Sequence, residues 1–221
     1  MAFAVLNEND QPIIDAFVPA TGRLSDHLPA KIQQLLTEHS LDFNDISEWS
    51  VGAGPGSFTG LRIASAFVMG LTDSREDVRV RSVSTAAMFA ANAKLDCKYV
   101  LVMFDGRKKE ILTTGLVHTP NGYAETGFTG VIRSIEDAEK MMSGFDCAVA
   151  FSSDHDAVRA VLGNVFADSV FRLEKLSAVP LVLNNPEDFS RSPSQLAYLR
   201  PAVFVEPQQL RDLSHLKGAC S

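Results

Sequence analysis

The sequence of 221 residues has few cysteines, no closely spaced pair of histidines and no long hydrophobic run. Cys97, Cys147 and Cys220 are odd in number, far apart and without a C-x-x-C pair, which argues against a disulfide framework or a zinc site and indicates reduced thiols. No run approaches the ~20 apolar residues of a membrane helix, and the start lacks the features of a signal peptide. These absences predict a cytoplasmic protein with no metal, no cofactor and no membrane partner.

The negative net charge of the chain disfavours direct binding to nucleic acid. A formal charge of −7 and a pI near 5.2 repel a phosphate backbone, whose binding depends on clustered Lys and Arg. Any contact with RNA is therefore expected to pass through another subunit. The 46% hydrophobic content supplies a sizeable core for one large or two small domains.

The most informative segment is residues 51–66, VGAGPGSFTGLRIASA, where an apolar stretch meets a Gly/Pro turn and then a helical pattern. The glycines allow positive φ and close backbone approach. Ser57 and Thr59 are candidate N-cap residues for a helix expected over residues 58–71. A phosphate-binding role for this turn has weak support, because neither the G-x-G-x-x-G spacing nor the lysine of a P-loop is present.

The expected helix has two faces. Leu61, Val68 and neighbouring apolar residues (Phe67, Leu71) form a core stripe, whereas Gly56, Gly60 and Ala64 form a stripe without bulk that a second helix could approach closely. Packing inside the same domain and packing against a partner are both open at this point. Arg62 beside the small stripe is either solvated or an interface residue that pairs with a carboxylate.

Strands alternating with helices predict an α/β architecture. The expected strands lie at residues 3–6, 13–18, 78–83, 99–104, 111–118 and 147–151, and the expected helices at residues 28–39, 58–71, 84–94, 134–142 and 157–162.

Other polar clusters lack the parts of an active site. The charged residues at positions 105–110 are expected to form a turn held by Asp105, and residues 154–156 a surface loop. Ser57 is not in a G-x-S-x-G elbow, and no histidine is marked as its base. No catalytic residue is predicted.

Several motifs resemble the bacterial TsaB (YeaZ) family. GPGSFTGLR at residues 54–62 is similar to that family's signature, RSVSTAAMFA at residues 81–90 to its V-S-T-L segment, VLVMFDGRKKEI at residues 100–111 to its strand and D-A-R-x-x-E turn, and Tyr198-Leu199-Arg200 to its Y-L-R. These similarities keep their order over most of the chain.

The resemblance implies an actin/hexokinase-like (RNase H-like) fold with two α/β lobes, expected at residues 1–105 and 106–221. It also implies a non-catalytic scaffold that binds a TsaD-type catalytic subunit in tRNA threonylcarbamoyladenosine synthesis, together with a TsaE-type ATPase, and that forms a homodimer when alone. The implied partner surface comprises Leu28, Ile32, Leu35, Gly56, Ser57, Thr59, Gly60, Arg62, Ile63 and Ala64.

The sequence departs from the family at its start. Members open with a strand close to I-L-A-I-D-T, whereas Met1 to Leu6 here resembles their second strand. The resemblance places the first strand in the middle of a sheet, so its absence would leave backbone groups unpaired. Either a real strand precedes this sequence, or the sheet has closed up or borrows a strand from another molecule.

Two alternative functions remain. A diverged enzyme of the same superfold, a phosphotransferase or a glycoprotease-like M22 peptidase, would turn over ATP or peptide. A degenerate paralogue that acts only as a homodimer would not bind the TsaD-type subunit.

Overall fold

In this computed structural model the described residues are 1–19, 27–189 and 192–195. Cys220 and the Tyr198-Leu199-Arg200 motif lie outside them. The strands are β1 (Ala2–Leu6), β2 (Pro12–Phe17), β3 (Glu48–Gly52), β4 (Arg79–Val83), β5 (Tyr99–Asp105), β6 (Ile111–Thr119), β7 (Gly122–Ile132), β8 (Cys147–Phe151) and β9 (Val170–Leu173). The helices are α1 (Leu28–Glu38), α2 (Phe58–Thr72), α3 (Thr85–Ala93), α4 (Ile135–Met142), α5 (His155–Asp168) and α6 (Val179–Leu183), with short 3-10 turns η2 (Phe43–Asp45) and η3 (Ser152–Asp154).

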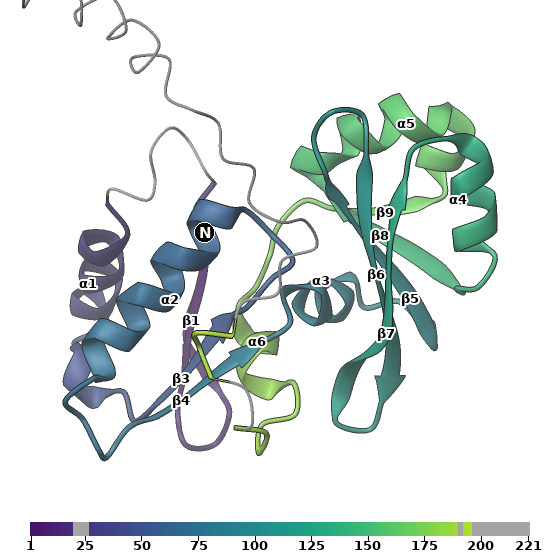
Figure 1. Ribbon diagram of the computed structural model, residues 1–221. Coiled ribbons are helices and arrows are strands. Elements are labelled where there is room, and N and C mark those ends of the chain that lie inside the picture. Colours follow the sequence, from purple (N-terminus) through teal and green to yellow (C-terminus); the bar gives the residue numbers. More distant parts are fainter. Residues whose placement is uncertain (20–26, 190–191, 196–221) are drawn as a thin grey trace, which may run out of the picture.

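The five-stranded sheet has the order β7-β6-β5-β8-β9, with β5, β8 and β9 parallel and β6 and β7 antiparallel. Along β5, Val100, Val102 and Phe104 face a core with α3, whereas Leu101 and Met103 face a core with α4 and α5. Alternate residues of a strand point to opposite faces, so a continuous apolar run suits a strand covered on both sides. Figure 1 shows α4 and α5 on the outer side of this sheet and α3 on its inner side.

The first four strands form two separate pairs. The β1–β2 hairpin is antiparallel and β3–β4 is parallel, and among the described residues neither pair is hydrogen-bonded to the other. Phe3, Phe43, Ile46 and Phe67 nevertheless belong to the apolar clusters of both pairs. Among the described residues the two pairs therefore do not form one continuous sheet, and helices α1 and α2 cover one side of both pairs (Figure 1).

The domain boundary predicted after Asp105 falls inside the five-stranded sheet. It would separate β5 from its own sheet, because β5 pairs with β6 on one side and β8 on the other. The five-stranded sheet begins at Tyr99, and after β9 the chain returns to the strand pairs through α6, which contacts β1 and β3. The core around α3 also takes residues from both parts of the chain, including Val83 and Val149.

One buried arginine holds this return segment in place. Arg81 on β4 is 2% exposed, and its guanidinium donates to the carbonyl oxygens of Leu181, Val182, Asn184, Asn185 and Asp188. Its Nε also donates to the Ser50 hydroxyl oxygen at 2.9 Å. Several of these carbonyls belong to the end of α6, where backbone oxygens lack helical partners. Burial lowers the pKa of Arg81, but all the donors of its planar group find acceptors.

Candidate functional site

The glycine turn after β3 is fixed by the segment that joins β4 to α3. The Ala53 amide donates to the Val83 carbonyl at 2.8 Å, the Gly54 amide to Thr85 Oγ1 at 3.1 Å, and the Thr85 amide to the Gly54 carbonyl at 2.8 Å. Gly54 has φ +108°, a conformation that favours glycine. The two family-like motifs thus meet in space, and the Gly54 amide, a candidate for phosphate binding, already donates to Thr85.

Ser57 begins α2 as predicted. Its hydroxyl accepts from the Gly60 amide at 3.4 Å, and its carbonyl accepts from the Leu61 amide at 2.9 Å. These bonds satisfy amides that a helix start leaves without partners. Thr59, the other candidate cap, lies exposed in the first turn.

The faces of α2 agree with the sequence pattern only in part. Leu61, Ser65 and Val68 are buried, and Phe67 and Leu71 are half-buried against the clusters beneath the helix. The small stripe is not uniformly outward, because Ala64 packs against the cluster of Trp49, while Gly56 and Gly60 are exposed. Ile63 is half-buried. The exposed residues of α2, here called the α2 surface, are Thr59, Gly60, Arg62, Ala66, Met69 and Gly70.

Part of the predicted partner surface belongs instead to the chain's own core. Ile32 is 5% exposed and packs with Val5, Ile14 and Leu36, and Leu35 is 9% exposed. Side chains this buried have little surface left for a partner. Leu28 is half-buried against the same cluster, so only the outer residues of α1 and the α2 surface remain accessible.

The α2 surface consists mainly of small residues and carries little charge. Arg62 is the one charged residue between positions 58 and 72. A Cβ at Gly60 would meet only Ser57 atoms, the nearest at 3.5 Å, and one at Gly70 would meet nothing within 4 Å. Met69 is 43% exposed. The exposed side of a surface helix usually carries polar and charged residues, so this composition is that of a contact face.

The charged turn after β5 has the structural role that the sequence predicted. Asp105 Oδ1 accepts from the Arg107 amide at 2.8 Å, and Asp105 Oδ2 lies 3.0 Å from the Arg107 guanidinium. Residues 107–109 all have positive φ, between 51° and 61°. Local bonds of this kind define the turn, and no substrate-facing role is needed to explain them.

The predicted surface loop at residues 154–156 is wrong, because Asp154 ends η3 and His155 begins α5 with 6% exposure. Burial raises the pKa of Asp154, hydrogen bonds from Ser153 and the Asp105 amide lower it, and the negative charge of Asp105 raises it again. Among the described residues, no three metal-ligating side chains come together, at this turn or elsewhere.

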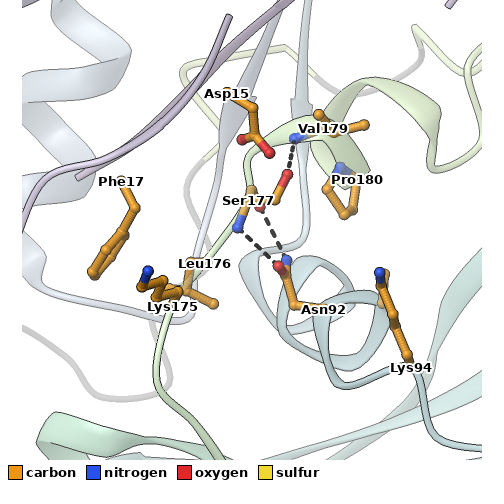
Figure 2. A pocket seen from close by; sticks show the side chains of 10 residues that line it. Asp15, Phe17, Asn92, Lys94, Lys175, Leu176, Ser177, Val179 and Pro180 are labelled. Atoms are coloured by element: carbon orange, nitrogen blue, oxygen red, sulfur yellow. Dashed lines mark hydrogen bonds between the residues drawn. The ribbon is translucent and has the colours of Figure 1, made fainter. Parts of the chain in front are cut away.

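A cavity of about 650 Å³ lies between β2, the end of α3 and residues 175–180 (Figure 2). Its central polar groups are engaged within the protein. Asn92 donates to the carbonyls of Met88 and Ser177 at 2.8 and 3.0 Å and accepts from the Ser177 amide at 2.8 Å. The Ser177 hydroxyl in turn accepts from the Val179 amide at 3.1 Å. The bonds between Asn92, Ser177 and Val179 are drawn in Figure 2, and the two between Asn92 and Ser177 join α3 to the segment that leads into α6.

The described part of the chain contains no helix that is both long and apolar enough to span a bilayer.

Comparisons with known proteins support the α/β fold described above. A family model described as TsaD, tRNA N6-adenosine threonylcarbamoyltransferase, matches residues 18–127. The structure of YeaZ from Pseudomonas aeruginosa has a TM-score of 0.67 and 20% identity, covering 89% of this chain and 93% of that one. A second structure, of an uncharacterized protein with similarity to peptidase YeaZ from Pseudomonas aeruginosa, gives the same TM-score and identity, with 90% and 94% coverage. The fold is thus α/β with a TsaD-like, actin-like domain.

Two curated relatives are described as tRNA threonylcarbamoyladenosine biosynthesis protein TsaB. The protein from Buchnera aphidicola subsp. Acyrthosiphon pisum is 31% identical over 87 residues, 38% of this chain and 39% of the relative. The protein from Bacillus subtilis is 33% identical over 98 residues, 44% of this chain and 42% of the relative. The aligned segments thus span about two fifths of each relative's length. In sequence the chain is thus similar to TsaB proteins over about two fifths of its length, and in fold it is similar to YeaZ over most of it.

Proposed function

We propose that this chain is a non-catalytic subunit in the biosynthesis of tRNA threonylcarbamoyladenosine, where it binds and supports a TsaD-type catalytic subunit. Similarity to the curated TsaB proteins supports the pathway, and the TsaD family match supports a related partner fold. In this proposal the chain is cytoplasmic and contributes no catalytic residue, a TsaE-type ATPase joins the complex, and tRNA is contacted only indirectly. Without its partner, the chain forms a homodimer.

The observation that carries the proposal is the composition of the α2 surface. Small residues allow close approach of a second helix, a packing mode best characterised between membrane helices. Exposed Met69 supplies an apolar contact, and the Arg62 guanidinium suits bidentate pairing with a carboxylate at the edge of an interface. A partner helix laid across Gly60 and Gly70 would meet no bulky side chain from this chain at either position.

The test is light scattering coupled to size-exclusion chromatography on this protein mixed with the TsaD-type subunit from the same genome. We expect a 1:1 complex. Gly60→Leu and Gly70→Leu each place a side chain on the contact face and should weaken binding at least about 30-fold, the loss typical of an interface hot spot.

Gly144→Leu is the matched control. Gly144 follows α4, which Figure 1 shows on the far side of the molecule from α2, and a Cβ at Gly144 would make one ordinary contact at 3.7 Å. This variant should bind like the unmodified chain. Full binding by Gly60→Leu and Gly70→Leu, with melting temperatures unchanged, would remove α2 from the interface. A stable homodimer that ignores the TsaD-type subunit would favour the paralogue alternative, and ATP turnover by the purified chain would favour the enzyme alternative.

A further inference from the structure

The cavity between β2, the end of α3 and residues 175–180 has the size and the lining of a small-molecule site. Its volume of about 650 Å³ falls within the roughly 300–1,000 Å³ of known ligand pockets. Its wall combines apolar and charged side chains (Figure 2). The apolar ones are Phe17, Ala91, Leu176, Val179 and Pro180, and the charged ones are Asp15, Lys94 and Lys175.

The three charged side chains come from separate parts of the fold. Asp15 belongs to β2, Lys94 is the C-cap of α3, and Lys175 follows β9. Within the described part of the chain, none of the three takes part in an ion pair. Glu174, the acid next to Lys175, is instead paired with Arg172 at 2.8 Å. The opening therefore has one net positive charge, in a chain whose formal charge is −7.

The middle of the wall is held in place by the protein's own contacts. Asn92 donates to the Ser177 carbonyl and accepts from the Ser177 amide, and the Phe17 ring packs edge-on against Phe151 with centroids 5.7 Å apart. The Ser177 hydroxyl accepts from the Val179 amide, and its own proton has no acceptor among the described residues. The cavity thus offers a hydroxyl donor and a ring in fixed positions, and such preorganisation favours ligand binding.

We propose that this cavity binds an elongated, sugar-derived dianion, with an anionic group at each end and hydroxyl groups between them. Figure 2 shows the two lysines on opposite sides of Asn92 and Ser177, so each ammonium group pairs with a different end of the ligand. The Asp15 carboxylate repels a bare anion and therefore selects ligands whose hydroxyl groups donate to it. The site shares no residue with the α2 surface, so its test is independent of partner binding.

The probe is glucarate, a six-carbon chain with hydroxyl groups and a carboxylate at each end. In an NMR titration of the full chain at low salt, it should shift the amide signals of residues 91–94 and 175–179 with a Kd of roughly 0.1–1 mM. Gluconate lacks one carboxylate and should bind at least about fivefold more weakly. Fructose bisphosphate tests phosphate in place of carboxylate at the two ends. Binding of either dianion at these residues supports the site, and binding of neither refutes it.

The lysines are tested by what they do to the preference for glucarate over gluconate. Lys94→Met and Lys175→Met should each abolish this preference without lowering the melting temperature, since both side chains are exposed. Lys140→Met is the matched control, because Lys140 is exposed in the last turn of α4, on the other side of the five-stranded sheet from α3 (Figure 1). It should keep the preference. An equal loss in all three variants would mean that the dianion responds to overall charge, and the proposal would fail.

Asp15→Asn tests the selecting carboxylate. Adipate has the two carboxylates of glucarate but no hydroxyl groups, so the unmodified chain should bind it at least about threefold more weakly than glucarate. Asp15→Asn should bind adipate about two- to threefold more tightly than the unmodified chain does, because a repelling charge is gone, and should prefer glucarate less. Weaker binding of adipate by Asp15→Asn would overturn the role of Asp15.

Discussion

The two groups of strands are held together in different ways. In the five-stranded sheet each of the three inner strands, β6, β5 and β8, has a hydrogen-bonded partner on both sides. Among the described residues, each of β1 to β4 has one partner only. Backbone ladders therefore unify the five-stranded sheet, whereas the strand pairs depend on the helices that cover them and on side chains that reach across.

In the strand pairs, side chains such as Arg81 make connections that backbone hydrogen bonds make in the five-stranded sheet. It connects β4 to residues 181–188, and Asn184 carries the connection to β7, since its Oδ1 accepts from the Tyr123 amide. Ser65 on α2 and Ser82 on β4 donate to the carbonyls of Pro193 and Ser192. Residues 184–188 and 192–193, here called the strap, thus attach to β4 and α2, in the part of the molecule whose described strands form only pairs.

The largest effect is expected from removing the buried guanidinium. Arg81→Met keeps the apolar volume but leaves the carbonyls of residues 181–188 without their donor. Loss of one partner from a buried charged network should lower the free energy of unfolding by roughly 3–5 kcal/mol. Urea denaturation followed by fluorescence of Trp49, which is buried beneath α2, measures this loss in the affected region.

Arg79→Met is the matched control on the same strand. The Arg79 side chain is 56% exposed, pairs with Glu48 and lies over the Phe189 ring at 4.4 Å. An exposed ion pair of this kind contributes about 1 kcal/mol or less. Hydrogen exchange of Arg81→Met should show faster exchange in β3 and β4 than in β5 and β8. Equal losses of protection in the strand pairs and in the five-stranded sheet would mean that the molecule unfolds as one unit. The two groups of strands would then not differ in stability.

Most elements with a regular apolar pattern could be predicted from the sequence. β8 has the bounds expected, and the starts of α2 and α4 follow from the capping residues Ser57 and Ser134. β7 was missed because its sequence, GYAETGFTGVI, is rich in glycine and polar residues, and much of it is exposed. Such a strand gains its place from pairing with β6, which a local pattern does not encode.

The candidate site was predictable in its position but not in its orientation. The glycine turn and the α2 helix follow from residues 51–66, yet the periodicity could not say which apolar residues of α1 face the chain's own core. Ile32 and Leu35 have the same apolar character as interface residues, and only the fold shows that they are buried. Arg81 is the opposite case, since arginine is mostly exposed in proteins and nothing in its sequence context marks it as buried.

A moderate effect is expected from loosening the strap at its far end. Ser65 is 4% exposed, and its hydroxyl donates to the Pro193 carbonyl at 2.7 Å. Ser65→Ala removes this bond at a cost of about 1 kcal/mol, partly offset by the higher helix propensity of alanine. Urea denaturation should therefore show that the free energy of unfolding falls by roughly 0.5–1 kcal/mol.

Ser143→Ala is the control. It removes an exposed local bond to the Lys140 carbonyl and should change the free energy of unfolding by less than about 0.5 kcal/mol. Equal losses of stability in the two variants would show that the hydrogen bond from Ser65 to the strap adds no measurable stability.

The smallest effect concerns the five-stranded sheet, at the turn that follows β8. Burial raises the pKa of Asp154 above its unfolded value, so protonation favours folding. This contribution is fully present below the unfolded pKa of about 3.9 and is lost as the pH rises through the higher folded value. At pH values above its raised folded pKa, the chain thus carries Asp154 as an ionised, partly buried carboxylate. Asp154→Asn should raise the melting temperature slightly at pH 7, with the gain vanishing at low pH.

Asp156→Asn is the control, because it makes the same charge change at an exposed position in the first turn of α5 and should instead lower the melting temperature slightly. Destabilisation by Asp154→Asn at pH 7 would mean that contacts with Arg107 and the Asp105 amide outweigh burial, and that this sheet too depends on side chains at its edge.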